Sequence, residues 1–64
     1  MTRYRVQPVD SVGVREYISI IDGDVKRAIQ KLTIINGSIQ TVLKKDDVYF
    51  ARFKNDRCYM ITKV

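Results

Sequence analysis

Apolar and β-branched residues dominate the C-terminal part of the chain, from residue 38 onward. Three segments there are rich in Val, Ile, Thr, Tyr and Phe, and Asp and Asn residues cluster between them. Short runs of this kind, separated by turn-forming residues, are typical of strands joined by tight turns. The pattern predicts a three-stranded antiparallel meander, with strands at residues 38–44, 48–54 and 57–64.

The N-terminal residues 2–7 also alternate between apolar and polar positions. Tyr4 and Val6 fall on one side, whereas Arg3, Arg5 and Gln7 fall on the other. Strict alternation predicts a strand with one buried face. The next residue is a proline without a backbone N–H, so it is expected to end this strand or to mark a sheet edge.

Residues 12–21 fit two patterns. Apolar side chains fall at helical spacing, but several of these residues are β-branched and also alternate as a strand would. We expect a helix over 12–21, with a strand as the alternative. The helical stripe consists of Val14, Tyr17, Ile18 and Ile21.

The segment from Val25 to about residue 33 carries the clearest helical pattern of the chain. Asp24 suits the N-cap, and Asn36-Gly37 supplies the left-handed residue that ends a helix. The apolar face is formed by Val25, Ala28, Ile29 and Leu32. The alternative, a pure β-meander or small barrel with hairpin turns at 22–23 and 36–37, would place Arg27 and Lys31 beside Ile29, which disfavours it.

These elements predict a small α+β domain. It contains an N-terminal strand, one or two short helices and the C-terminal three-stranded antiparallel meander. With 64 residues, the chain is expected to form a single basic domain over 1–64. A domain of this size buries roughly 60% of its unfolded surface and gains about 3–5 kcal/mol net. A homodimer that shares a core would compensate for so small an interior.

Cysteine content and hydrophobic runs suggest a location. Cys58 is the only cysteine, so no disulfide can form within the chain and a reducing setting is expected. No apolar run reaches the length of a membrane span, and the N-terminus lacks an apolar signal core. We therefore expect a cytoplasmic protein that does not enter a membrane.

The chain carries a formal net charge of +5, from twelve Lys and Arg against seven Asp and Glu. Most acidic residues fall in the expected turns or at a helix start, whereas the basic residues lie largely inside the expected strands and helices. This segregation leaves positive faces, which favour an anionic partner such as nucleic acid or an acidic protein surface.

The turn at Asn55-Asp56 decides which residues of the last two strands face each other. As a two-residue turn it pairs Lys54 with Arg57, and opposed residues of antiparallel strands share a face. One face would collect Tyr49, Ala51, Phe53, Cys58 and Met60, and the other Phe50, Arg52, Lys54, Arg57, Tyr59, Ile61 and Lys63.

The turn before Val48 leaves two registers open, and a shift of one residue moves every side chain to the opposite face. A three-residue loop at 45–47 places Ile39, Thr41 and Leu43 on the face of Phe53, whereas a two-residue loop at 46–47 places them on the face of Phe50. We prefer the three-residue loop, because it gives the helix a nearly apolar face to pack on.

The opposite face then interleaves aromatic and basic side chains. Aromatic rings stack on bases and cations contact phosphates, so the face suits single-stranded RNA or DNA. The structural alternative is that its apolar residues are covered by the N-terminal segment or by a second subunit. The candidate nucleic-acid-binding residues are Phe50, Arg52, Lys54, Arg57, Tyr59 and Lys63.

The favoured function is a small nucleic-acid-binding or regulatory module. The alternative is a protein-interaction module, such as a small inhibitor or adaptor, whose target is an acidic protein surface. We expect no enzymatic activity, because the chain has no His, no nucleophile with a base and no glycine-rich phosphate loop. Turn and cap roles explain the aspartates, so neither a metal nor another cofactor is expected.

Overall fold

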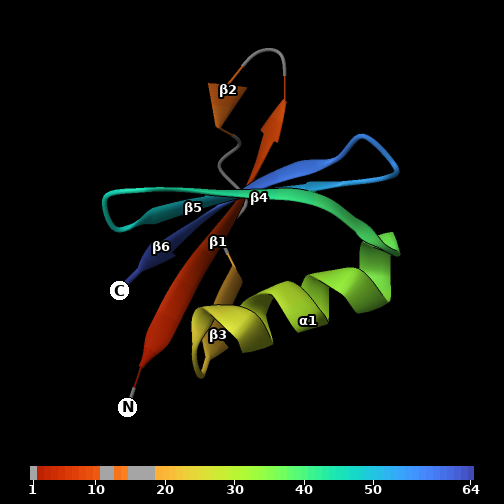
Figure 1. Ribbon diagram of the computed structural model, residues 1–64. Helices are drawn as coiled ribbons and strands as arrows, with labels where there is room; N and C mark the ends of the chain where they lie inside the picture. The colour runs from red at the N-terminus through yellow and green to blue at the C-terminus, as the bar shows by residue number, and fades with distance from the viewer. Residues whose placement is uncertain (1, 11–12, 15–18) are drawn as a thin grey trace.

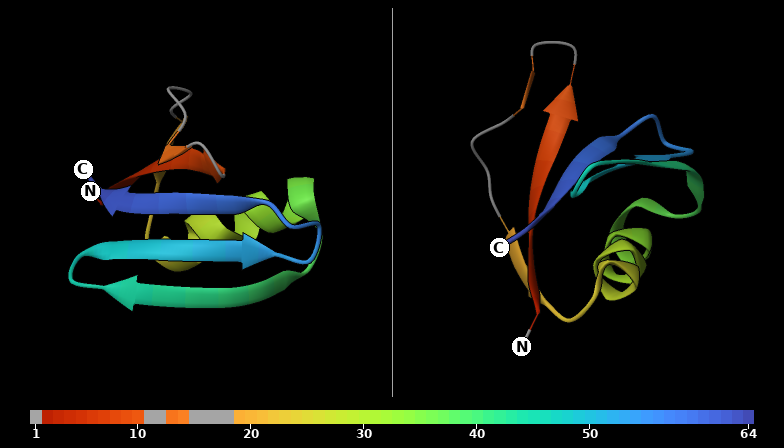
Figure 2. Two further views of the ribbon diagram at one scale, coloured as in Figure 1. Left: turned by 90° about the horizontal axis from the view of Figure 1, so that it is seen from above. Right: turned by 60° about the vertical axis from the view of Figure 1, so that its left-hand side comes forward.

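The computed structural model describes residues 2–10, 13–14 and 19–64. Over these ranges the chain forms one antiparallel sheet and one helix, which covers one face of the sheet (Figures 1 and 2). The strand order is β2-β1-β6-β5-β4, and β3 also pairs with β1. The elements are β1 (Arg3–Asp10), β2 (Gly13–Val14), β3 (Ser19–Asp22), α1 (Val25–Asn36), β4 (Ile39–Lys45), β5 (Val48–Phe53) and β6 (Cys58–Lys63).

The predicted meander is confirmed as β4, β5 and β6, each pairing antiparallel with the next. The N-terminal strand is confirmed too, and it lies antiparallel beside β6, at the opposite side of the meander from β4. The expected α+β class therefore holds in outline. The strand order and the number of helices differ from the prediction.

Pro8 lies inside β1 rather than at its end. Backbone groups alternate in direction along a strand. Because the Val64 N–H bonds to the Arg3 carbonyl across the β1–β6 pair, Pro8 directs its nitrogen away from β6. On that side β3 pairs only as far as Val6 and β2 begins at Val9. The residue that lacks an N–H therefore occupies a gap in the pairing.

The prediction of a helix over 12–21 was wrong for the described part of that segment. Gly13–Val14 and Ser19–Asp22 are strands that pair with the two ends of β1. Ile21 pairs with Tyr4 and is buried in the core, so the alternating pattern prevailed over the helical one. Residues 11–12 and 15–18 lie outside the described residues.

The helix α1 confirms the signals at both of its ends. Asp24 accepts a hydrogen bond from the Arg27 N–H at 2.9 Å, as an N-cap does. Gly37 ends the helix with a positive φ of 84°, and its N–H bonds to the Thr33 carbonyl. The helix runs to Asn36, about one turn beyond the predicted end.

The core lies between α1 and the inner face of the sheet, which is the face that α1 covers. Ala28 and Leu32 are buried from the helix side, and Val25 and Ile29 pack against the same cluster, so the predicted helical face is confirmed. The buried core residues are Val6, Ile21, Ala28, Leu32, Ala51, Phe53, Tyr59 and Ile61.

The predicted register between β5 and β6 was wrong by one residue. Ala51 pairs with Tyr59, and the turn contains three residues, Lys54 to Asp56. The Asp56 N–H bonds to the Phe53 carbonyl and Asp56 has a φ of 70°, which is the conformation of a three-residue hairpin loop with a left-handed last residue. Every side chain of β6 is therefore on the opposite face from the one predicted.

The register between β4 and β5 was also wrong by one residue. Lys45 pairs with Val48 across a two-residue turn, in which Asp46 has a φ of 55°. Leu43 consequently lies opposite Phe50 and away from α1. An irregularity between Ile39 and Thr41 lets Ile39 remain on the core side, where it pairs with Phe53.

Candidate interaction surface

The side of the sheet away from α1 is termed the outer face. The strand registers arrange twelve of its residues in three rows across β1, β6, β5 and β4. The rows are Val9, Cys58, Arg52 and Thr41; Gln7, Met60, Phe50 and Leu43; and Arg5, Thr62, Val48 and Lys45. All twelve are described residues, and none of them is acidic.

Apolar side chains occupy the middle of the outer face. Phe50 is 39% exposed and lies directly opposite Leu43, which is 63% exposed. Met60 is half-buried and lies opposite Phe50 on the other side. A depression of about 360 Å³ adjoins this group, and it is lined by Val9, Thr41, Leu43, Phe50, Ala51, Arg52 and Cys58.

Three cations surround this apolar group, and all three are exposed: Arg5, Lys45 and Arg52. Arg5 and Lys45 lie at the two ends of one row, on β1 and β4. The Arg52 Nη2 atom lies 3.5 Å from the Asp56 Oδ1 atom, with both side chains more than half exposed. An ion pair this exposed contributes little to stability, so Arg52 remains able to exchange partners.

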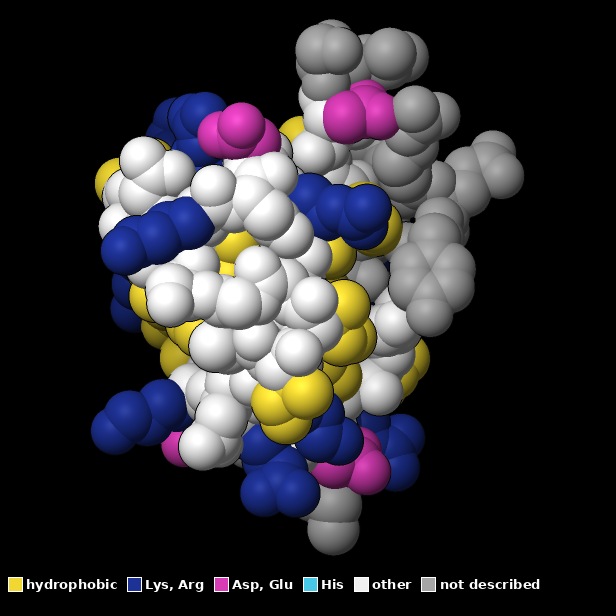
Figure 3. Space-filling view, turned by 90° about the vertical axis from the view of Figure 1, so that its right-hand side faces the viewer, with side chains coloured by type: hydrophobic (Ala, Val, Ile, Leu, Met, Phe, Trp, Pro, Cys, Tyr) yellow, Lys and Arg dark blue, Asp and Glu magenta, His cyan; other side chains and the backbone are white. Residues whose placement is uncertain are grey.

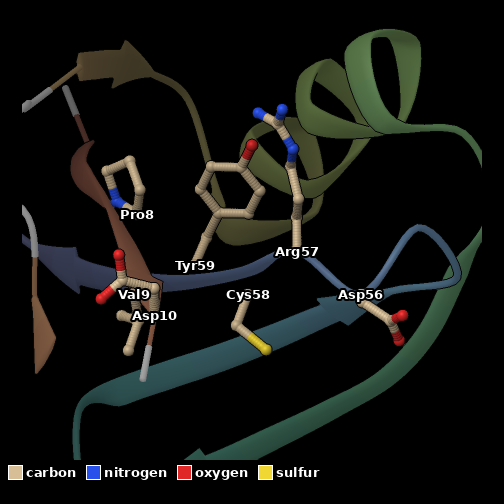
Figure 4. A pocket seen from close by; sticks show the side chains of 7 residues that line it. All are labelled: Pro8, Val9, Asp10, Asp56, Arg57, Cys58 and Tyr59. Atoms are coloured by element: carbon tan, nitrogen blue, oxygen red, sulfur yellow. The ribbon is translucent and has the colours of Figure 1, made fainter. Parts of the chain in front are cut away.

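The six candidate nucleic-acid-binding residues are not brought together on one face. Phe50 and Arg52 lie on the outer face, as expected. Lys54 lies in the β5–β6 turn, and Lys63 pairs with Tyr4 on the inner side. In Figure 4, Tyr59 and Arg57 extend toward α1, whereas the Cys58 sulfur points the opposite way.

Tyr59 has a structural role. It is 9% exposed, and its hydroxyl donates to the Asn36 Oδ1 atom at 3.1 Å. Its ring meets the Phe53 ring edge to face, with centroids 5.7 Å apart. A ring held in this way offers little surface on which a base could stack, so the position of Tyr59 does not favour the stacking role expected for it.

The outer face also contains Leu43 and Met60, which the preferred register placed against α1; they come from the two strands whose faces are inverted. Arg5 lies on this face as well, as expected for an N-terminal strand that joins the sheet with Tyr4 and Val6 inward. The alternative two-residue turn at 46–47 was the signal that would have placed Leu43 correctly. No comparable signal in β6 distinguished its two faces, because both are apolar.

A second depression, of about 390 Å³, lies where β1 meets the start of β6 (Figure 4). Its polar lining residues are Asp10, Asp56 and Arg57, and its other lining residues are Pro8, Val9, Cys58 and Tyr59. Among the residues that the structure describes, no buried side-chain nitrogen or oxygen lacks a hydrogen-bond partner. Nothing in this depression therefore points to a particular ligand.

Metal binding gains no support across the described ranges. They contain no group of three or more His, Cys, Asp or Glu side chains that could hold a metal ion. Figure 3 shows how the charged side chains are distributed over one side of the molecule: Lys and Arg form several separate groups, some of them next to acidic side chains. On this side no continuous basic stripe is present.

Comparisons with protein-family models, with curated proteins and with solved structures find no match to this chain. The described residues include no helix long and apolar enough to cross a membrane.

Proposed function

We propose that the chain is a small protein-binding module whose outer face contacts an acidic protein surface that also carries apolar side chains. The observation that supports this most is the exposed pair of Phe50 and Leu43 on a sheet face that α1, the helix of the described residues, does not cover. Exposed neighbouring apolar side chains ringed by polar groups are typical of interaction sites. The proposal involves binding without catalysis.

The composition of the outer face favours a protein partner over a single nucleic-acid strand. A stacking platform uses two or more aromatic rings in sequence, whereas the described residues in the rows of this face include one aromatic ring, Phe50, beside the aliphatic Leu43 and Met60. Phe, Met and Arg are enriched in protein interfaces, with apolar residues at the centre and charges at the rim. The outer face has this arrangement.

The cations of the outer face account for the expected charge of the partner. Arg5, Lys45 and Arg52 lie around the apolar centre, and the whole chain is positively charged at +5. Complementary charges raise association rates and select among partners more than they add affinity. Association should therefore slow down as the salt concentration rises.

A peptide-display selection against the immobilised chain tests this function. We expect the selected peptides to be enriched in Asp, Glu and apolar residues, and to lose at least about tenfold in affinity for Phe50→Ala, a typical effect of removing an interface aromatic. Lys31→Ala, an exposed change on α1, is the matched control and should bind normally. Peptides that bind Phe50→Ala as well as the unchanged chain would contradict the proposal.

Nucleic-acid binding is the second candidate, because Phe50 is exposed on the same face as Arg52 and the net charge is +5. Fluorescence anisotropy with labelled single-stranded RNA, single-stranded DNA and duplex DNA at two salt concentrations tests it. Tight binding to single strands that weakens steeply with salt, and is lost in Phe50→Ala, would favour this candidate over the protein partner. Absence of binding at low salt would eliminate it.

A further inference from the structure

The strand β4 forms an open edge of the sheet. It is the last strand in the order, and no described segment pairs with its far side. In the left view of Figure 2 it forms the lower border of the sheet. An open edge presents unpaired backbone N–H and C=O groups, which can pair with another extended chain.

The strand registers identify which backbone groups are unpaired. The Phe53 N–H bonds to the Arg57 carbonyl, so alternate residues of β5 back to Tyr49 direct their backbone groups to β6. The residues between them face β4, where their partners include Leu43 and Lys45. By the same alternation, Val42 and Lys44 direct their N–H and C=O groups outward.

The side chains of β4 are exposed on both faces near this edge. Val42 is 41% exposed on the side of α1, and Leu43 is 63% exposed on the outer face beside Phe50. The irregularity in pairing lies before Thr41, so the strand is regular from there to Lys45. An added strand would therefore meet an apolar side chain on each face of the sheet.

The charges of β4 indicate what would add to it. Lys44 and Lys45 are exposed at the end of the strand, and the Lys44 Nζ atom lies 5.5 Å from the centroid of the Tyr49 ring. Edge lysines oppose pairing with another positively charged strand and favour an acidic one. The aspartates at 46 and 47 lie in the turn beyond the strand, so a strand that ends opposite Lys44 does not meet them.

We propose that an extended acidic segment of a protein partner, with apolar and acidic residues alternating, pairs with β4 as a further strand of the sheet. This inference rests on the proposed function and adds the binding mode to it. One row of the segment's side chains lies beside Leu43 and Phe50 on the outer face. Its backbone bonds to Val42 and Lys44, and its acidic residues lie on the opposite face, the side of α1, where the Lys44 side chain lies.

The test uses a labelled, capped peptide in which Val alternates with Glu, and measures its binding by fluorescence anisotropy. Val42→Pro removes an outward N–H without removing a bond to β5, whereas Val42→Thr keeps that N–H and serves as the control. We expect Val42→Pro to weaken binding by about tenfold or more and Val42→Thr to change it little. Circular dichroism establishes that each variant is folded.

A second measurement does not depend on how the variants fold. Alternate amides of a paired peptide point toward β4 and away from it. N-methylation of the amides that point toward β4 removes their hydrogen bonds to the strand, whereas N-methylation of the other amides leaves these hydrogen bonds intact. We expect only one of the two methylated peptides to bind the unchanged chain. Equal binding of both would overturn the added strand.

The remaining outcomes separate this inference from the proposed function. If display-selected peptides require Phe50 but bind Val42→Pro normally, the outer face binds proteins without an added strand. If neither Phe50→Ala nor Val42→Pro affects their binding, both proposals fail. If the chain self-associates in sedimentation measurements and Val42→Pro abolishes this, the occupant of the edge is a second copy instead of an acidic partner.

Discussion

The two faces of the sheet differ in how deeply they bury their phenylalanines, although Phe50 and Phe53 both come from β5. Phe53 at the end of β5 is fully buried on the inner face, in contact with Tyr59. Phe50, on the same strand, is 39% exposed on the outer face. The inner face therefore has its geometry fixed by packing against α1, whereas the outer face keeps apolar surface that α1 does not cover.

The largest expected effect follows from exchanging each of these rings for Ala. Phe53→Ala removes a fully buried ring and should cost about 3–5 kcal/mol, as much as the whole stability of so small a domain. Phe50→Ala should cost below about 1 kcal/mol, because the ring is partly exposed already. Urea denaturation followed by circular dichroism compares the two, and equal losses would contradict the assignment of faces.

The next effect concerns the polar contact that joins α1 to the inner face. Asn36 is buried; its Oδ1 atom accepts from the Tyr59 hydroxyl and from the Asn55 amide, both at 3.1 Å. Asn36→Ala would leave the Tyr59 hydroxyl buried without that partner, at a cost of about 1–3 kcal/mol. Tyr59→Phe removes only one donor and should cost about 1 kcal/mol. Thermal denaturation measures the loss of stability in both variants. A smaller loss for Asn36→Ala than for Tyr59→Phe would argue against the contact.

A smaller change should weaken the fold without affecting the outer face. Asp24→Ala removes the N-cap of α1 and should cost about 1 kcal/mol of unfolding free energy. Peptides selected on the outer face should still bind, because α1 lies on the other side of the sheet. Lys26→Ala, in the first turn of the same helix and exposed, is the control for stability. Loss of peptide binding in folded Asp24→Ala would show that the two faces are not independent.

The smallest expected effect tests the register directly. Cys58 is half-buried on the outer face, whereas the register predicted from the sequence had placed it against α1. A thiol reagent should label it in the folded protein at a rate that Asp24→Ala does not change, because no global unfolding is required. A labelling rate that rises with each loss of stability would indicate a thiol in the core.

The sequence predicted the strands of the meander and α1 with both of its caps, and it placed β5 correctly. The two strands beside it, β4 and β6, were predicted with their side chains on the opposite faces, because each connecting turn differs by one residue from the predicted loop. In β6 both alternating sets are apolar, so hydrophobic pattern could not choose between Tyr59 and Ile61 on one side and Cys58 and Met60 on the other. The choice depends on Asp56, whose left-handed conformation lengthens the turn.

The error in β4 has a different origin. We had assumed that its apolar residues turn inward, but β4 is an edge strand that is exposed almost throughout, so burial does not fix its register. Because of the irregularity after Ile39, the Ile39 side chain packs on the core, whereas the Leu43 side chain lies on the outer face. Such an irregularity leaves no mark in the alternation of residue types.

The contact of Asn36 with Tyr59 and Asn55 also has a consequence for how the protein folds. These bonds join residues 23 and 19 positions apart, across the end of α1, β6 and the β5–β6 turn. They can form only after the β5–β6 hairpin has formed and met the helix, so they should be made late in folding. In native-state hydrogen exchange, we expect the last turn of α1 and the β5–β6 turn to open together, as one cooperative unit.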